Sequence, residues 1–579
     1  MSNFLERKSL VFLSFLSFTI LFLILHYSFH DIYPADESLY LLMIRHPTFI
    51  DVLCTFFGFV YHPIYNFLNG NVLELRQFNV LLTFALGWLL CFEFFRLIVE
   101  NQRTINYSFF QRFFLSAALS LSSILPLANL GATGITPNYH SLALQAYYIA
   151  ALSILYLDKE VSVSSIIGWF LMAIAIWLTF MGLPTSAIGL GIFFNIYIFC
   201  CKKVNWKLIL FSICVMTGLF TFTAIAVAGS LKAFFIFCQN TYTIIQASSH
   251  SPMLLFITLF KGLIPLSIFF ILYYLLPTRV FLKSIGLFFL VTICLLMLFF
   301  NQHMVLDEIN YILDHYFMGI LAAPVRYIGL LLWLIPFLTV LYTLKRKKSR
   351  TTDRVLHNNQ TAILYLILPF LLPFGTNGYW ALWSTASFLG ILASLALLSY
   401  FRPKELNRVF LTLILYSQII ITLVFTPALS KSLAYDGSAL DGLVNIIKQH
   451  GFQPKDTMLD LSGFCLVAVP YQLEAKTVGF PYLCLPEQYD LKAYVIANIN
   501  NGSCKRLSKS WVLFSTAEPF NLDILKIYGA NITTDFKLMS SYPYNNYRIQ
   551  IFKPIRSAET AEAACELTRQ KARPRVVVE

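Results

Sequence analysis

The sequence predicts an α-helical polytopic membrane protein with about 13 transmembrane helices and a small C-terminal extracytoplasmic α/β domain. Two observations predict this class. The chain of 579 residues is 58% hydrophobic and only 12% charged, whereas soluble domains average about 25% charged residues. It also contains 55 phenylalanines. Large apolar side chains with so little polar surface need lipid as their solvent.

Apolar runs of the length that crosses a bilayer, about 17–25 residues, fill the chain up to residue 428. We place them at 9–29, 79–99, 111–130, 139–157, 163–181, 184–201, 207–229, 253–276, 284–300, 326–344, 361–375, 380–400 and 408–428. The first run begins with basic residues, but it is too long for a signal peptide and no small-residue cleavage site follows it. We therefore expect residues 1–428 to form one transmembrane domain whose first helix is uncleaved.

The distribution of Lys and Arg predicts the orientation. About twenty of them fall in loops on the same side as the N-terminus, and the loops on the other side hold only Arg45, Arg76, Lys232 and Arg326. The positive-inside rule then places the N-terminus in the cytoplasm, and an odd number of spans places the C-terminal domain outside. The net charge of +13 belongs to these loops. No basic face with interleaved aromatic residues indicates a nucleic-acid partner.

Short apolar runs alternate with polar turns over residues 429–555, which is typical of a small α/β domain. Strands are expected at Met458–Leu461, Trp511–Ser515 and Tyr547–Phe552, and helices at Ala439–His450 and Phe520–Tyr528. Residues 556–579 are charged and are expected to form a flexible tail.

Four cysteines lie on the predicted outer side, where disulfides can form: Cys465, Cys484, Cys504 and Cys565. The sequence leaves open whether they form two bridges, one or none. Their spacing is not that of a zinc site.

The first outer loop, about residues 30–78, holds the best candidates for chemistry. Loops this long in compact proteins are often functional, and its aromatic residues suit short helices in the membrane interface. Asp36 and Glu37 follow the first span directly. A carboxylate held at an apolar interface can serve as a general base. Alternatively, Asp36 caps a helix that begins at Glu37.

Three segments of this loop resemble the first loop of GT-C glycosyltransferases, such as aminoarabinose transferases acting on lipid A and protein O-mannosyltransferases. They are Pro34 to Tyr40 (PADESLY), His62 to Asn66 (HPIYN) and Leu75 to Asn79 (LRQFN). The shared layout is an acidic pair after the first helix, a basic or His-Pro pair some 25 residues later and an Arg entering the second helix. The specific motifs cover about residues 30–90, and the topology covers most of the chain.

The resemblance implies a sugar transferase with a polyprenyl-phosphate sugar as donor. Asp36 would be the catalytic base for inversion at the anomeric carbon. Glu37 would orient the acceptor or a water, or hold the base in position. The chain departs from family members that carry a second acid between spans three and four, because Leu127 to Pro137 contains none. The partner of Asp36 in acceptor binding is therefore open.

A lipid-phosphate leaving group needs nearby cations. The candidates for the donor phosphate or sugar are Lys261 inside the eighth span, Arg76 and Arg326 at outer helix ends, and His62, Tyr139 and His140. Each has a simpler alternative. Lys261 could snorkel to the interface, the arginines could anchor helices, His62 could enter a helix in a turn before Pro63, and Tyr139 and His140 could be packing residues.

No cofactor is expected, no metal ligand is assigned, and the need for a divalent ion is open. Asp307, Glu308 and Asp314 could bind such an ion with Asp36 or form a solvated helix face. The expected partners are the lipid-linked donor, an unknown glycan, lipid or protein acceptor, and membrane lipids, in a bacterial inner membrane.

Two other functions remain open at this stage. One is a glycan ligase or polymerase with a diphosphate-linked donor, although such enzymes usually carry their long outer loop late in the series of spans. The other is a transporter or flippase for a lipid-linked substrate, which would need paired polar residues inside the spans. Only Lys261, Asn195 and Gln418 stand out there, and no internal repeat is visible.

Overall fold

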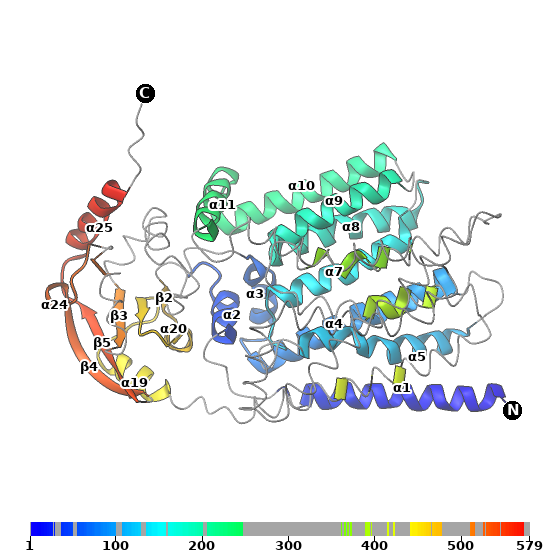
Figure 1. Ribbon diagram of the computed structural model, residues 1–579, viewed down its shortest axis with the longest axis horizontal. Coiled ribbons are helices and arrows are strands. Elements are labelled where there is room, and N and C mark those ends of the chain that lie inside the picture. The colour runs from blue at the N-terminus through cyan, green and yellow to red at the C-terminus, as the bar shows by residue number, and fades with distance from the viewer. Residues whose placement is uncertain are drawn as a thin grey trace, which may run out of the picture.

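A computed structural model gives the fold. It describes residues 2–26, 28, 36–49, 55–99, 107–128, 135–157, 160–200, 205–246, 440–464, 466–477, 510–515, 525–526, 529–544 and 546–572, with isolated residues and short groups between 361 and 422. The described part is mostly helical, with one sheet near the C-terminus (Figure 1).

The long helices run side by side along one direction (Figure 1). They are α1 (Ser2–His26), α4 (Val72–Phe94, continued by the π-helix η1, Phe95–Val99), α5 (Phe109–Ser120, continued by η3, Leu121–Ile124, and α6, Leu125–Ala128), α7 (Tyr139–Tyr156), α8 (Val163–Gly182), α9 (Pro184–Cys200) and α10 (Trp206–Ala228). The next helix, α11 (Leu231–Gln246), crosses this direction (Figure 1). Within the described residues, four stretches are long and apolar enough to cross a membrane: Val72–Leu97, Phe109–Leu127, Val163–Gly182 and Trp206–Ala228.

The first seven predicted spans coincide with α1, α4, α5 with its extensions, α7, α8, α9 and α10. The next three, over residues 253–344, lie outside the described residues, and the last three are represented only by short helical groups. The total of thirteen spans therefore stays a prediction.

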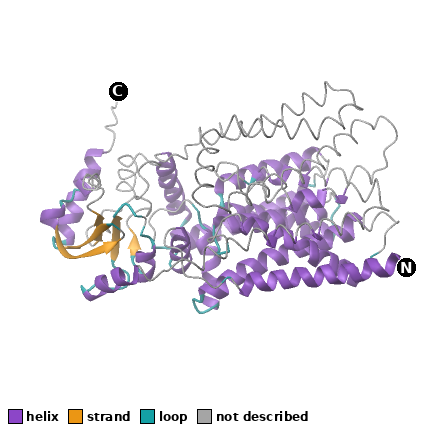
Figure 2. Cartoon of the chain, turned by 60° about the horizontal axis from the view of Figure 1, so that its bottom comes forward, coloured by secondary structure: helices purple, strands orange, loops and turns teal. Residues whose placement is uncertain are grey.

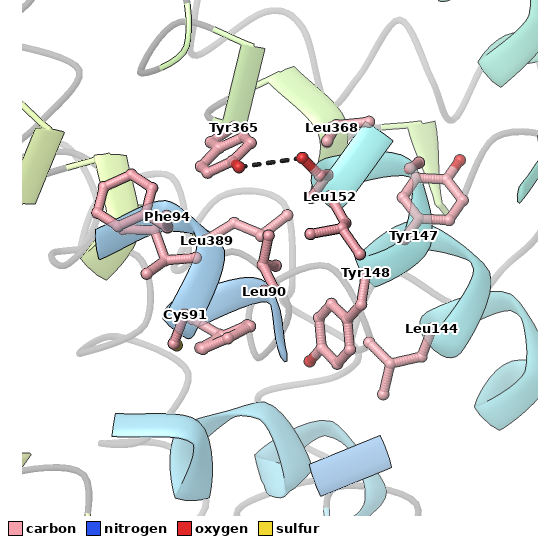
Figure 3. Close-up of a cluster of buried hydrophobic side chains, with 14 of the residues drawn as sticks. Leu90, Cys91, Phe94, Leu144, Tyr147, Tyr148, Leu152, Tyr365, Leu368 and Leu389 are labelled. Carbon is pink, nitrogen blue, oxygen red and sulfur yellow. Dashed lines mark hydrogen bonds between the residues drawn. The ribbon is translucent and has the colours of Figure 1, made fainter. Parts of the chain in front are cut away.

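The outer surface of these helices is apolar, as lipid requires. Phe12 and Phe15 of α1 and Phe222 of α10 are 64%, 70% and 67% exposed. The interior is closely packed as well: Phe94, Tyr148 and Leu152 meet in a buried cluster (Figure 3). Tyr365, far along the chain, joins this cluster and donates a hydrogen bond to the carbonyl of Ala151 at 3.0 Å. Late segments thus pack into the same core as the early helices.

Gln418, one of the polar residues expected inside a span, bonds to the first helix. Its amide nitrogen lies 2.7 Å from the hydroxyl of Ser17 and also donates to the carbonyl of Leu13. This side chain therefore joins a late segment to α1.

Two short helices of the first outer loop, α2 (Asp36–Arg45) and α3 (Phe57–Phe67), lie between the ends of the long helices and the sheet (Figure 1). We call them the first-loop helices. The prediction of short helices here is confirmed. The alternative of His62 as a helix-entry residue is wrong, because Pro63 lies inside α3 and His62 is in mid-helix.

The described residues between 440 and 572, for which we keep the name C-terminal domain from the prediction, contain a five-stranded sheet in the order β2-β1-β3-β5-β4. Figure 2 shows this sheet in orange. Its elements are α19 (Asp441–Gln449), β1 (Thr457–Leu461), α20 (Ala468–Leu473), β2 (Lys476–Thr477), β3 (Ser510–Ser515), α24 (Ile532–Asp535), β4 (Phe536–Tyr544), β5 (Tyr547–Pro554) and α25 (Ala558–Ala572). β1 pairs in parallel with β2 and β3, and β5 pairs antiparallel with β3 and β4.

The three strands and the first helix expected in this region are present. The second expected helix, Phe520–Tyr528, lies largely outside the described residues. The expected flexible tail is instead helical over α25. Ala561 and Cys565, four residues apart and so on one helix face, are buried, and Cys565 is disulfide-bonded.

Candidate active site

The acidic pair at the start of α2 is divided between two environments. The helix begins at Asp36 itself, whose side chain is exposed, while the adjacent Glu37 is completely buried. Two acids in the first turn are favoured there, because the N-terminal end of a helix carries partial positive charge. Successive helical residues point about 100° apart. One carboxylate of the pair can thus face outward while its neighbour is enclosed.

Glu37 is held by two side chains from distant parts of the chain. Arg76, in the first turns of α4, donates from Nη2 and Nε to Glu37 Oε1 at 2.6 and 2.9 Å. The hydroxyl of Thr136, just before α7, donates to the same oxygen. Arg76 is itself only 2% exposed. A buried ion pair with added hydrogen bonds has its charges compensated on both sides.

The guanidinium of Arg76 makes two further contacts. Its Nε lies 3.1 Å from Thr136 Oγ1, and its Nη1 donates to the carbonyl of Ser28 at 3.2 Å. One side chain therefore joins α2, α4, the approach to α7 and the chain that follows α1. The structure places Arg76, which the sequence offered as a donor-phosphate contact or a helix anchor, against the buried Glu37.

A second buried polar network lies one helical turn further along α4. Tyr61 of α3 donates to Gln145 Oε1 at 2.8 Å, and the amide of Gln145 donates to Asn79 and Thr83 at 2.8 and 3.0 Å. Burial raises the pKa of the Tyr61 hydroxyl well above its usual value, so this group remains a donor. The network fixes α3 against α4 and α7.

His62 has partners on both ring nitrogens. Nδ1 lies 2.8 Å from the carbonyl of Ile44, and Nε2 lies 3.0 Å from the amide of Asn66. The carbonyl can only accept, so Nδ1 carries the proton and Nε2 accepts from Asn66. This side chain therefore ties α3 to the end of α2.

Tyr139 and His140 begin α7, as expected. Asn138 caps the helix by accepting from the backbone N–H groups of His140 and Ser141, both at 2.9 Å. The ring of Tyr139 meets Tyr40 of α2 edge-on, with 5.8 Å between centroids. Tyr139 therefore packs against α2 at Tyr40, which lies shortly after the acidic pair in the sequence.

The other predicted site residues, Lys261 and Arg326, lie outside the described residues, as do Asp307, Glu308 and Asp314. Within the described residues, no three His, Cys, Asp or Glu side chains come together as metal ligands do. The structure thus brings Arg76 to Glu37 at the start of α2, Tyr139 to Tyr40 and His62 to Ile44 near the end of α2, while His140 contacts Tyr139 and Asn138 at the start of α7.

Sequence reasoning missed Thr136 and Ser28. Neither belongs to a recognisable motif. The nearest signal is Asn138, whose place before an apolar run marks the start of α7.

Comparison with solved structures finds a similar protein. The chain is similar to the crystal structure of ArnT from Cupriavidus metallidurans bound to undecaprenyl phosphate, with 12% sequence identity, a TM-score of 0.49 and coverage of 94% of this chain and 97% of that chain. No protein-family model and no curated protein matches the sequence.

Proposed function

We propose that this protein is an inverting glycosyltransferase of the GT-C type, which moves a sugar from a polyprenyl-phosphate donor to an acceptor hydroxyl at the outer face of the membrane. The observation that carries the proposal is the division of labour in the acidic pair. Asp36 is presented outward at the first residue of α2, and Glu37 beneath it is fixed by Arg76 and Thr136. A catalytic base needs this kind of rigid support.

The chemistry assigned to Asp36 is a single displacement. Its carboxylate takes the proton of the acceptor hydroxyl while that oxygen attacks the anomeric carbon. The bond from this carbon to the phosphate oxygen breaks on the opposite side, and the lipid phosphate leaves with the electron pair. The products are the glycosylated acceptor and polyprenyl phosphate. No covalent enzyme intermediate is needed, which agrees with the absence of a nucleophile motif in the sequence.

The roles of the neighbouring residues follow from their contacts. Glu37 and Arg76 are positioning residues, because each is buried against the other. His62 is assigned the same role, since both ring nitrogens are already engaged. The leaving phosphate still needs positive charge, and we assign it to Lys261 and Arg326. Tyr139 and His140, which are partly buried at the start of α7, are the proposed sugar contacts.

We further propose that the protein is inserted in a bacterial inner membrane. The C-terminal domain and Asp36 would then lie on the side away from the cytoplasm. The sheet and the first-loop helices lie at the end of the helical bundle opposite the N-terminus (Figure 1). Cys565 is disulfide-bonded, and such bonds persist in oxidising compartments. Both observations agree with the orientation expected from the Lys and Arg distribution.

The experiment that tests this function is transfer of labelled sugar from a panel of polyprenyl-monophosphate donors by purified protein. We expect turnover by wild type and a loss of about 10²–10⁴-fold in Asp36→Asn, the range that general-base catalysis supplies. Glu74→Gln is the matched control, because Glu74 is also an exposed acid in the first turn of a helix. It should leave transfer unchanged.

Each outcome of this experiment is informative. Full transfer by Asp36→Asn would remove Asp36 as the base. No turnover with any monophosphate donor by a folded wild-type protein would refute the proposal in favour of a diphosphate-linked donor or of transport. A parallel series with EDTA shows whether a divalent ion takes part.

A further inference from the structure

The C-terminal domain rests directly on the first-loop helices through α20. Val467 and Tyr471 of this segment belong to the same buried apolar cluster as Leu41 of α2 and Phe57 of α3. Tyr65 of α3 belongs to the same cluster. The C-terminal domain and the first-loop helices therefore share one packed apolar cluster.

The polar contacts across this junction meet the far end of α2. Arg45, the last residue of α2, forms an ion pair with Glu474. The guanidinium of Arg45 also lies 5.9 Å from the centre of the Tyr471 ring, a distance at which a cation is attracted to an aromatic face. The C-terminal domain thus contacts the end of α2 that lies opposite Asp36.

The chain just after α2 covers the edge of the sheet. β2 is an edge strand, and the N–H of Thr477 donates to the carbonyl of Phe49 at 3.2 Å. The ammonium of Lys476 lies 5.7 Å from the centre of the Phe49 ring. An edge strand normally leaves such groups unpaired. Here the first outer loop supplies the partner.

The backbone conformation of Glu474 is unfavourable for a residue that carries a side chain. This residue ends α20 in the left-handed conformation, with φ of 52°. Glycine is the usual residue at such a position because it has no Cβ to crowd the backbone. A non-glycine residue held there is strained, and such strain often marks a functional constraint. The carboxylate of Glu474 forms the ion pair with Arg45, which a glycine at this position could not form.

We propose that Glu474, through Arg45, is a positioning residue by which the C-terminal domain sets the direction of α2 and hence the place of Asp36. This inference rests on the proposed function, with Asp36 as the base. Glu37 fixes one end of the helix to the bundle, and Arg45 fixes the other end to the C-terminal domain. The two ends are about 13 Å apart at 1.5 Å per residue.

Loss of the second contact would let α2 pivot about the buried Glu37. Asp36 lies next to that pivot, so its displacement would be small, but small errors matter for a reacting group. A misplacement of 1 Å can lower a rate by about 10²-fold. The donor and acceptor contacts elsewhere would remain, so the effect should fall on kcat rather than on KM.

The discriminating variant is Glu474→Gly, because it removes the ion pair while relieving the backbone. We expect its unfolding temperature to equal or exceed that of wild type, while kcat falls about 10-fold or more and KM for the donor is unchanged. The charge exchange Arg45→Glu with Glu474→Arg should recover part of the lost kcat. A residue with a merely structural role would not show this separation of stability from rate.

A matched control breaks an ion pair that lies wholly inside the C-terminal domain. Arg556 and Asp535 are 3.0 Å apart, and Asp535→Asn should lower the stability of the domain without changing kcat. Wild-type kcat in Glu474→Gly would overturn the positioning role. If only Asp36→Asn is inactive, the proposed function stands and this inference fails.

Amide hydrogen exchange tests the same inference without any assay of transfer. Residues 36–45 should exchange faster in Glu474→Gly than in wild type or in Asp535→Asn. Unchanged exchange of α2 would overturn the inference even if the donor were never identified. A protein that transfers no sugar but shows faster exchange would instead refute the proposed function and keep the mechanical coupling.

Discussion

Two adjacent carboxylates, Asp36 and Glu37, differ in burial: the side chain of Asp36 is exposed, and that of Glu37 is buried against Arg76. The guanidinium of Arg76 reaches Glu37 with two nitrogens at 2.6 and 2.9 Å. Removing one member of such a pair leaves an uncompensated charge in a region of low dielectric constant, whereas removing both does not. The energetic role of the pair is therefore measurable as a coupling.

We expect Glu37→Leu and Arg76→Met each to destabilise the protein by about 3–5 kcal/mol, the usual cost of breaking a buried pair. The double variant should be destabilised by much less than the sum of the two. The measurement is thermal unfolding of the purified protein in detergent, with the exposed Glu559→Gln as a control that should not shift the transition. Additive losses would show that the two side chains do not act as a unit.

The sequence identified the position of the acidic pair but not its division. Which acid becomes buried depends on Arg76, 39 residues away, and on Thr136, 99 residues away. No local pattern carries that information. For the same reason, the sequence suggested that Arg76 could contact the donor phosphate but did not indicate that it pairs with Glu37.

At the scale of elements, the first-loop helices are held by an unusually close approach. A Cβ added at Gly58 of α3 would lie 2.3 Å from the carbonyl oxygen of Met43 in α2. Real Cβ atoms do not come so near to a backbone atom, so the two helices would have to separate. Glycine at this position is required by packing rather than by its backbone angles.

We predict that Gly58→Ala moves α2 away from α3 and lowers both stability and sugar transfer. The matched control is Gly191→Ala in α9, where an added Cβ meets nothing within 4 Å. That change should be neutral or stabilising by up to about 1 kcal/mol, since alanine is the better helix former. Unfolding temperature and kcat of both variants check the prediction, and equal behaviour of the two would contradict it.

Hydropathy located the early helices well and their ends less well. α4 begins at Val72, seven residues before the predicted run, because Asn71 caps it by accepting from the Glu74 N–H at 3.3 Å. Arg76 continues the helix, and Glu37 compensates its charge. A window that counts apolar residues ends at such side chains.

Among the elements of the C-terminal domain that escaped prediction, β4 and α25 did so for different reasons. β4 is only partly buried along most of its length, so it lacks the alternation of a half-buried strand. α25 reads as a charged tail, and its buried face is made of small side chains such as Ala561 and Cys565. Small residues carry little hydropathy signal, and the disulfide at Cys565 supplies stability that composition does not show.

For the whole molecule, that disulfide predicts a redox dependence of the C-terminal domain. We expect Cys565→Ser to lower its stability by about 2–5 kcal/mol, as loss of a native disulfide usually does. A reducing agent should lower the unfolding temperature of wild type and leave the variant unaffected. Equal sensitivity of the two proteins would show that Cys565 is not the stabilising cysteine.

The junction between α2 and α20 also has a consequence for the making of the protein. Arg45 and Glu474 are 429 positions apart in the chain, so the helix that carries Asp36 is synthesised long before its second support. At about 5–20 residues per second, that delay is roughly 20–90 s. The nascent chain therefore enters the membrane before α2 can pair with Glu474, and this contact forms only when translation has passed residue 474.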